Sequence, residues 1–160
     1  MSKAETPVPD TLRNAVNEAA LSYLKDKSAH SDVADELAKA VKGLGDVQTF
    51  CPDPSQYRYL AVSTGGVIFG FAYGMSLIAF RLNKTLTETA LRTGANDIPE
   101  LPEWVAFKLF RNDWPEFDLK FWARKAYVFA REAGDSRRML DEVPAFRQTT
   151  KKDPASPDGV

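Results

Sequence analysis

His30 and Cys51 are the first residues to consider for chemistry, because the chain has one histidine and one cysteine. A serine or cysteine nucleophile that an imidazole activates must therefore use His30. The one possible Cys–His pair is Cys51 with His30, and a predicted helix that begins at Ser31 separates the two in the chain. We therefore expect no catalytic residues. His30 is predicted to be a solvated turn residue, and Cys51 a small apolar residue that closes a strand.

Metal and phosphate sites find little support in the residue types. One histidine and one cysteine are too few for the usual zinc sites of nitrogen and sulfur ligands. Acidic residues gather where helices are expected to begin, and negative charge is favourable there against the helix dipole; they are Asp32, Asp35, Glu36, Asp113, Glu116 and Asp118. Gly65-Gly66 is followed by strand-like residues, which does not fit a phosphate-binding loop. We expect no metal and no cofactor.

Aromatic residues concentrate in the C-terminal part of the chain. Nine of the 18 aromatic residues (10 Phe, 3 Trp and 5 Tyr) lie between Trp104 and Phe129, and residues 104–152 carry 11 Lys/Arg against 7 Asp/Glu. A large aromatic core is one interpretation. The other is a partner-binding surface, because aromatic residues and arginine dominate interface hot spots. The predicted partner-binding residues are Trp114, Phe117, Phe121, Arg124 and Arg131.

The net charge of the chain bears on whether the partner is a protein or a nucleic acid. Aromatic residues interleaved with basic ones can bind single-stranded nucleic acid. The whole chain, however, has 21 Lys/Arg and 22 Asp/Glu and a net charge of -1, so a protein partner or self-association is favoured over nucleic acid. Arg58, Arg81 and Lys108 are candidates to bind an anionic ligand on the sheet. A small-molecule or enzymatic pocket between the sheet and the long C-terminal helix is therefore an alternative function.

The elements that must position these residues begin with two helices. With 160 residues, the chain is expected to form one domain over residues 10–147, after a flexible lead-in (1–9) and before a disordered tail (148–160). Apolar residues recur at helical spacing after Asp10 and again after Ser31, and each of these residues can cap a helix. The pair is predicted to form a helical hairpin.

The apolar period then changes to two, which indicates strands. Strands are expected at 47–51, 57–63, 67–72, 75–82 and 104–110. The connections between 57–63, 67–72 and 75–82 are too short for parallel pairing, so these three are expected to be antiparallel. One face of the 67–72 strand should carry Val67, Phe69 and Phe71. One face of the 75–82 strand should carry Ile78, Phe80 and Leu82. Asn83 should cap a short helix at 84–93, 95–103 should be a loop, and a long helix should run over 118–133. The predicted fold is α+β: an antiparallel sheet of four to five strands with helices on one face.

Residues 59–80 also admit a membrane interpretation. These 22 residues have no charge, lie between Arg58 and Arg81, and carry Gly66, Gly70 and Gly74 at four-residue spacing. Turn residues interrupt the segment, and Val, Ile, Phe and Tyr dominate between them, which favours strands. The N-terminus has no apolar core of a secretory signal, so a cytoplasmic location is expected. A membrane span at 59–80 remains the second alternative.

Three runs of sequence together resemble a known family. They are Gly66–Leu82 (GVIFGFAYGMSLIAFRL), Trp104–Phe110 (WVAFKLF) and Phe121–Tyr127 (FWARKAY). Their pattern is similar to that of the small α+β TfoX N-terminal-like (YjbR-related) domains, over roughly residues 57–133. The resemblance implies a regulatory or adaptor-like domain without established catalytic residues, and it transfers no site residue. The leading hypothesis is a non-enzymatic, cytosolic interaction domain that binds a protein partner through its C-terminal aromatic and basic surface.

Overall fold

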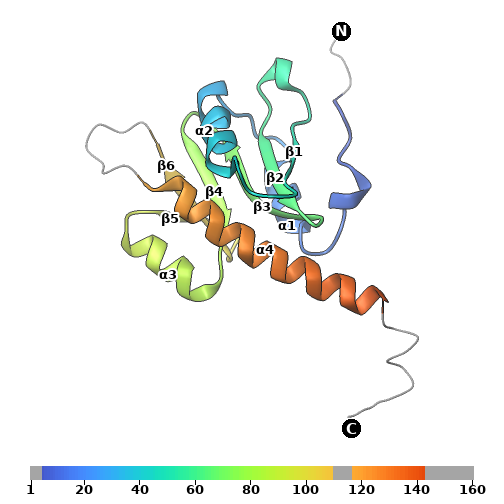
Figure 1. Cartoon of the computed structure of the whole chain (residues 1–160). Helices are drawn as coiled ribbons and strands as arrows, with labels where there is room; N and C mark the ends of the chain where they lie inside the picture. Colours follow the sequence, from blue (N-terminus) through green and yellow to red (C-terminus); the bar gives the residue numbers. More distant parts are fainter. Residues whose placement is uncertain (1–4, 110–116, 143–160) are drawn as a thin grey trace.

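The helices and strands follow the change of apolar period along the chain (Figure 1). The computed structural model describes residues 5–109 and 117–142, with side chains described as far as residue 133. In chain order the elements are a 3-10 turn η1 (Asp10–Leu12), α1 (Glu18–Leu24), α2 (Ser31–Val41), β1 (Gln48–Phe50), a second 3-10 turn η2 (Pro54–Gln56), β2 (Leu60–Thr64), β3 (Val67–Tyr73), β4 (Leu77–Arg81), α3 (Lys84–Arg92), β5 (Asn96–Asp97), β6 (Trp104–Lys108) and α4 (Leu119–Glu142). The end of the predicted strand at Phe110 and the predicted tail at 148–160 lie outside the described residues.

The strands form one antiparallel sheet, which confirms the α+β fold. Within the described residues the sheet has six strands in the order β1-β2-β3-β4-β6-β5. The five predicted strands are present, and the extra strand is β5, two residues within the predicted loop 95–103 that pair with Val105 and Ala106. Residues 59–80 make up β2, β3 and most of β4, and no helix in the described ranges combines the length and apolarity that a membrane crossing requires.

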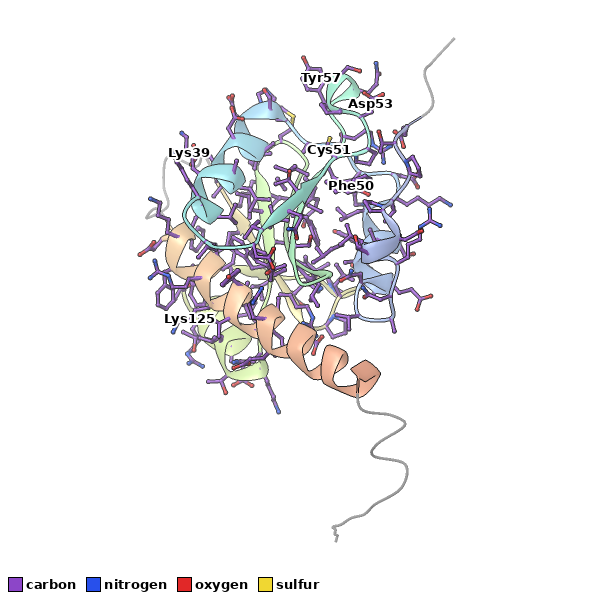
Figure 2. All side chains as sticks on the ribbon, turned by 45° about the vertical axis from the view of Figure 1, so that its right-hand side comes forward. Lys39, Phe50, Cys51, Asp53, Tyr57 and Lys125 are labelled. Carbon is purple, nitrogen blue, oxygen red and sulfur yellow. The ribbon has the colours of Figure 1, made fainter. Side chains whose placement is uncertain are left out.

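Helices cover both faces of the sheet, whereas the sequence predicted one covered face. Helices α2, α3 and α4 contribute to one buried cluster, which includes Phe69, Phe80 and Phe107. On the opposite face α1 packs with the other cluster of the described residues, which includes Phe71 and Trp104. Figure 2 shows the sheet between α1 and α2. The two N-terminal helices are therefore not a hairpin packed on itself.

The segment between α1 and α2 explains this separation. Ala29 donates its backbone N–H to the carbonyl of Tyr57 at 2.7 Å, and His30 donates to the carbonyl of Gly74 at 2.9 Å. Residues 28 and 29 thus form isolated bridges with Arg58 and Gly74, beside the start of β2 and the end of β3. The chain crosses the end of the sheet here, so α2 begins on the face opposite α1.

The prediction that Phe69 and Phe71 share one face of β3 is wrong, because β3 contains a bulge. Val62 pairs with Gly70 and Ser63 with Ile68, which leaves Phe69 as an extra residue. An extra residue reverses the side to which the following side chains point. Phe69 accordingly packs on the α4 face, and Phe71 on the α1 face, instead of sharing one face as predicted. The prediction for β4 is confirmed, because Ile78, Phe80 and Leu82 belong to one cluster.

The N-terminal region is attached to the sheet through Asn17. The Asn17 side chain is buried, donates to the carbonyls of Leu12 (2.9 Å) and Gly66 (2.8 Å), and accepts from the Ile68 N–H (2.9 Å). This side chain satisfies backbone groups that helix and strand would otherwise leave unpaired. The helix expected from Asp10 is therefore a 3-10 turn followed by a break, and α1 begins only at Glu18.

Candidate protein-binding surface

Helix α4 carries most of the predicted partner-binding residues, and its start is fixed by Asp118. The Asp118 carboxylate accepts the backbone N–H of Phe121 at 3.1 Å, which satisfies one of the unpaired donors of the first turn. Figure 1 shows α4 lying across the sheet. Its inner face is buried as the spacing predicted, and the Trp122 ring packs 5.5 Å from the Phe107 ring. The buried inner positions are Trp122, Ala123, Ala126 and Ala130.

The opposite side of α4 is both apolar and cationic. Phe121 is 41% exposed and Val128 is 47% exposed. Three exposed cations share this side, and we call the set the α4 outer face: Lys120, Phe121, Arg124, Lys125 and Val128. The Lys125 Nζ lies 5.4 Å from the centre of the Phe121 ring, which is a cation–π contact. Figure 2 shows Lys125 on α4 at the surface of the molecule.

The cations of the α4 outer face have no acidic partner among the described residues. From residue 119 to residue 131 the sequence contains no aspartate or glutamate. Among the described residues, no ion pair joins Lys120, Arg124 or Lys125 to an acidic group. In the described part of the chain, the face therefore presents three positive charges without an ion-pair partner around two partly exposed apolar side chains.

Arg131, a predicted partner-binding residue, contacts the chain itself. Its Nη1 donates to Asp46 Oδ2 and to Thr64 Oγ1, both at 3.1 Å. One turn earlier, the Tyr127 hydroxyl donates to the Gly45 carbonyl at 2.6 Å. These contacts join α4 to the α2–β1 loop and to the end of β2. We therefore assign Arg131 to the anchoring of α4 and leave it out of the α4 outer face.

Of the other predicted partner-binding residues, Phe117 packs against the core and Trp114 lies outside the described part of the chain. The Phe117 ring is half-buried and lies 4.9 Å from the ring of Phe107, in an edge-to-face contact. Trp114 lies outside the described residues. Phe121 and Arg124 are the predicted residues that the structure brings together at the surface. Sequence reasoning omitted Lys125, which the run without acidic residues could have indicated.

The three predicted ligand-binding residues lie at separate places. Arg58 donates from Nε to the Lys27 carbonyl at 2.9 Å and pairs with Glu5. Arg81 pairs with Glu103 at 2.9 Å, and its guanidinium lies 4.6 Å from the Phe129 ring centre. Lys108 is exposed at the other end of the β4–β6 pair, opposite Leu77. These residues are not brought together into one anion site.

The side chains of His30 and Cys51 each form a hydrogen bond with a backbone group. The His30 ring caps α2, because Nδ1 accepts the N–H of Asp32 at 3.0 Å, in place of the predicted cap Ser31. The Cys51 Sγ lies 3.5 Å from the Arg58 carbonyl oxygen, and burial raises the pKa of the thiol. A raised pKa reduces the thiolate population that a nucleophile needs. The described residues contain no cluster of three or more His, Cys, Asp or Glu side chains able to hold a metal ion.

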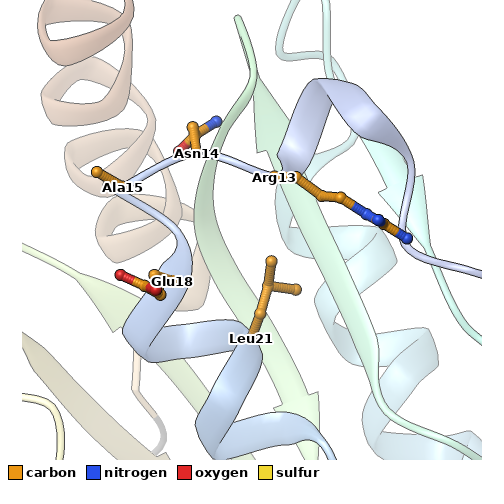
Figure 3. Close-up of a pocket in the computed structure, with 5 residues that line it drawn as sticks. All are labelled: Arg13, Asn14, Ala15, Glu18 and Leu21. Atoms are coloured by element: carbon orange, nitrogen blue, oxygen red, sulfur yellow. The ribbon is translucent and has the colours of Figure 1, made fainter.

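Three hollows lined by described residues lie beside α1 and the N-terminal segment. The first has a volume of about 500 Å³ and is lined by Arg13, Asn14, Ala15, Glu18 and Leu21 (Figure 3). A neighbouring hollow of about 320 Å³ shares Arg13 and Asn14, and the third, of about 480 Å³, lies between residues 5–8 and Arg58. The Asn14 amide is already bonded to the Gly66 carbonyl at 2.9 Å. These hollows lie away from the predicted pocket between the sheet and α4.

Comparisons with known proteins identify no relative. No family model matches the chain, and neither does any curated protein or any solved structure. The similarity to TfoX N-terminal-like domains therefore stays a prediction that rests on the three sequence runs alone.

Proposed function

We propose that this chain is a non-enzymatic, cytosolic interaction domain that binds another protein through the α4 outer face. The observation that carries the proposal is the exposure of Phe121 and Val128 among three cations that have no acidic partner in the described part of the chain. Exposed aromatic and arginine side chains are enriched where proteins bind one another. The opposite side of the helix is buried in the core, which fixes the position of the face on the sheet.

The small-molecule alternative is less well supported by the described residues. The hollows beside α1 fall within the size range of ligand sites. However, the Arg58 guanidinium in one of them is bonded to Glu5 and to backbone carbonyls, and the Asn14 amide in another is bonded to Gly66. Binding there would need these contacts to be replaced. Among the described residues, Lys120, Arg124 and Lys125 have no ion pair that binding would have to replace.

Photocrosslinking in cells tests the proposal. A photoreactive phenylalanine analogue is placed at position 121 or 128, and in control chains at Met75 or Leu91, which are exposed apolar positions outside α4. We expect a discrete protein to be crosslinked from positions 121 and 128 and not from the controls. Identical adducts from all four positions would argue against a specific α4 surface.

The crosslinked protein is then purified and its affinity measured against two charge-reversed variants. The test variant is Lys120→Glu/Arg124→Glu/Lys125→Glu. The control is Lys25→Glu/Lys42→Glu/Lys84→Glu, which changes the net charge equally at other exposed lysines. We expect the test variant to weaken binding by about tenfold or more and the control by about twofold or less. Equal affinities for the two variants would overturn the proposal.

A further inference from the structure

We infer that the partner docks an acidic amphipathic helix along the α4 outer face. The inference rests on the proposed function and specifies the chemistry of the partner. Phe121 and Val128 are seven residues apart, which is two turns of helix, so their side chains lie on one line along α4. A second helix laid against such a line contacts it through its own apolar residues at seven-residue spacing. The geometry of the exposed apolar residues therefore fits a helix.

The cations flank this apolar line on both sides. At 100° per residue, Arg124 and Lys120 lie on one side of the line through Phe121 and Val128, and Lys125 lies on the other. Charges in these flanking positions pair with opposite charges on a helix packed alongside. The α4 segment 119–131 has no acidic residue. The complementary helix therefore carries glutamate or aspartate on both sides of its apolar stripe.

The same features fit an anionic membrane or a nucleic acid less well. Peripheral membrane helices insert a broad and continuous apolar face. Here the exposed apolar side chains of α4 are only Phe121 and Val128 among the described positions, and each is about half covered. A nucleic acid would also meet the net charge of -1 that the whole chain carries. A protein helix needs only the local charge and the short apolar line.

Designed peptides test the inference directly. The probe is an acidic amphipathic peptide with leucine at heptad spacing and glutamate in the flanking positions. Its controls are a scrambled peptide of the same composition and a peptide with lysine in place of glutamate. We expect the acidic amphipathic peptide to bind at least about tenfold more tightly than either control, with weaker binding at high salt. Amide chemical-shift changes should map to residues 119–131. Equal binding of the scrambled peptide would overturn the inference.

Variants identify the residues responsible. Phe121→Ala/Val128→Ala keeps good helix formers and removes the apolar line, and we expect it to weaken peptide binding by about fivefold or more. Met75→Ala, at an apolar position that is 72% exposed elsewhere, should leave it unchanged. The charge-reversed α4 variant should lose binding while its exposed lysine control retains it. Circular dichroism melting of each variant shows that it is folded.

Further experiments distinguish a protein helix from a membrane or a nucleic acid. They also distinguish failure of the acidic-helix inference from failure of the proposed protein-binding function. Phosphatidylserine vesicles or a thymidine oligonucleotide that bound through the α4 cations, with no binding of the acidic peptide, would replace the helix with that ligand. A crosslinked protein that depends on the α4 outer face, without any binding of the acidic peptide, would retain the proposed function and reject the acidic helix. Loss of both the α4-specific crosslink and the peptide binding would reject both.

Discussion

Arg131 on α4 donates a hydrogen bond to Asp46, which lies 85 residues earlier in the chain, at 3.1 Å. The same guanidinium nitrogen reaches Thr64, so one side chain holds the α2–β1 loop and the end of β2 against α4. Because Arg131 is partly exposed, we expect Arg131→Met to lower the free energy of unfolding by only about 1 kcal/mol. Urea unfolding measures this change.

Measuring the affinity for the partner distinguishes an anchoring role of Arg131 from a role in partner recognition. The partner captured through α4 should bind Arg131→Met within about twofold of the original affinity, because the Arg131 guanidinium contacts Asp46 and Thr64 and is not part of the α4 outer face. Arg124→Met, on the α4 outer face, is the matched comparison and should weaken the same complex. If Arg131→Met weakened binding as much as Arg124→Met while its stability stayed unchanged, Arg131 would belong to the binding surface.

Gly70 in β3 has no room for a side chain. A Cβ atom at this position would lie 3.0 Å from two atoms of the Phe80 ring and 3.2 Å from Val62. We expect Gly70→Ala to destabilise the protein by about 1–3 kcal/mol through overpacking. Gly45→Ala is the control, because its nearest neighbour, the Tyr127 hydroxyl, is 3.9 Å away. Thermal unfolding that gave both variants the same midpoint would contradict the close packing at Gly70.

Asn17 should be the most important single polar residue for holding the N-terminal region. Asn17→Ala removes three hydrogen bonds and leaves the N–H of Ile68 and the carbonyl of Leu12 without this partner. The expected loss is about 2–4 kcal/mol. Asn14→Ala also removes three hydrogen bonds, to the Gly66 and Thr11 carbonyls and from the Asn17 N–H, but at a more exposed position, and it should cost less, about 1 kcal/mol. Hydrogen exchange at the Ile68 amide reports the difference directly.

The positions of the strands could be predicted because the pattern of apolar residues depends on local sequence. The face of each side chain could not always be predicted, since a bulge at Phe69, seen only in the pairing of β3 with β2, turns Phe71 to the other face. The same limit explains the wrong helical hairpin. Periodicity indicates that α1 and α2 each have an apolar side, but the bonds of Ala29 and His30 to Tyr57 and Gly74 decide which face of the sheet each helix covers.

The candidate surface shows the same division between local and long-range information. The exposure of Phe121 and Arg124 could be predicted, because it follows from their helical spacing relative to the buried Trp122. The intramolecular role of Arg131 could not, because Asp46 and Thr64 come from distant elements. His30 gave no sequence signal for capping, since histidine is not among the preferred capping residues.

We expect Tyr73 to make the free energy of unfolding sensitive to alkaline pH. Burial, followed by a hydrogen bond with Tyr23, raises the pKa of Tyr73 well above its usual value. Above the ordinary tyrosine pKa of about 10, the unfolded chain therefore releases a proton that the folded chain keeps. The contribution of Tyr73 to stability is complete below that pH and declines above it. The decline approaches about 1.4 kcal/mol per pH unit for this one group.

Tyr73→Phe tests this linkage, because it keeps the buried ring and removes the titrating hydroxyl. Urea unfolding between about pH 9 and 11 should give a shallower loss of stability for Tyr73→Phe than for the original chain. Tyr59, whose pKa burial also raises, remains in both proteins and contributes equally. Tyr57→Phe, the same substitution at a side chain that is 61% exposed, is the control. If the slope were the same for all three proteins, the buried hydroxyl of Tyr73 would not be the source of the alkaline sensitivity.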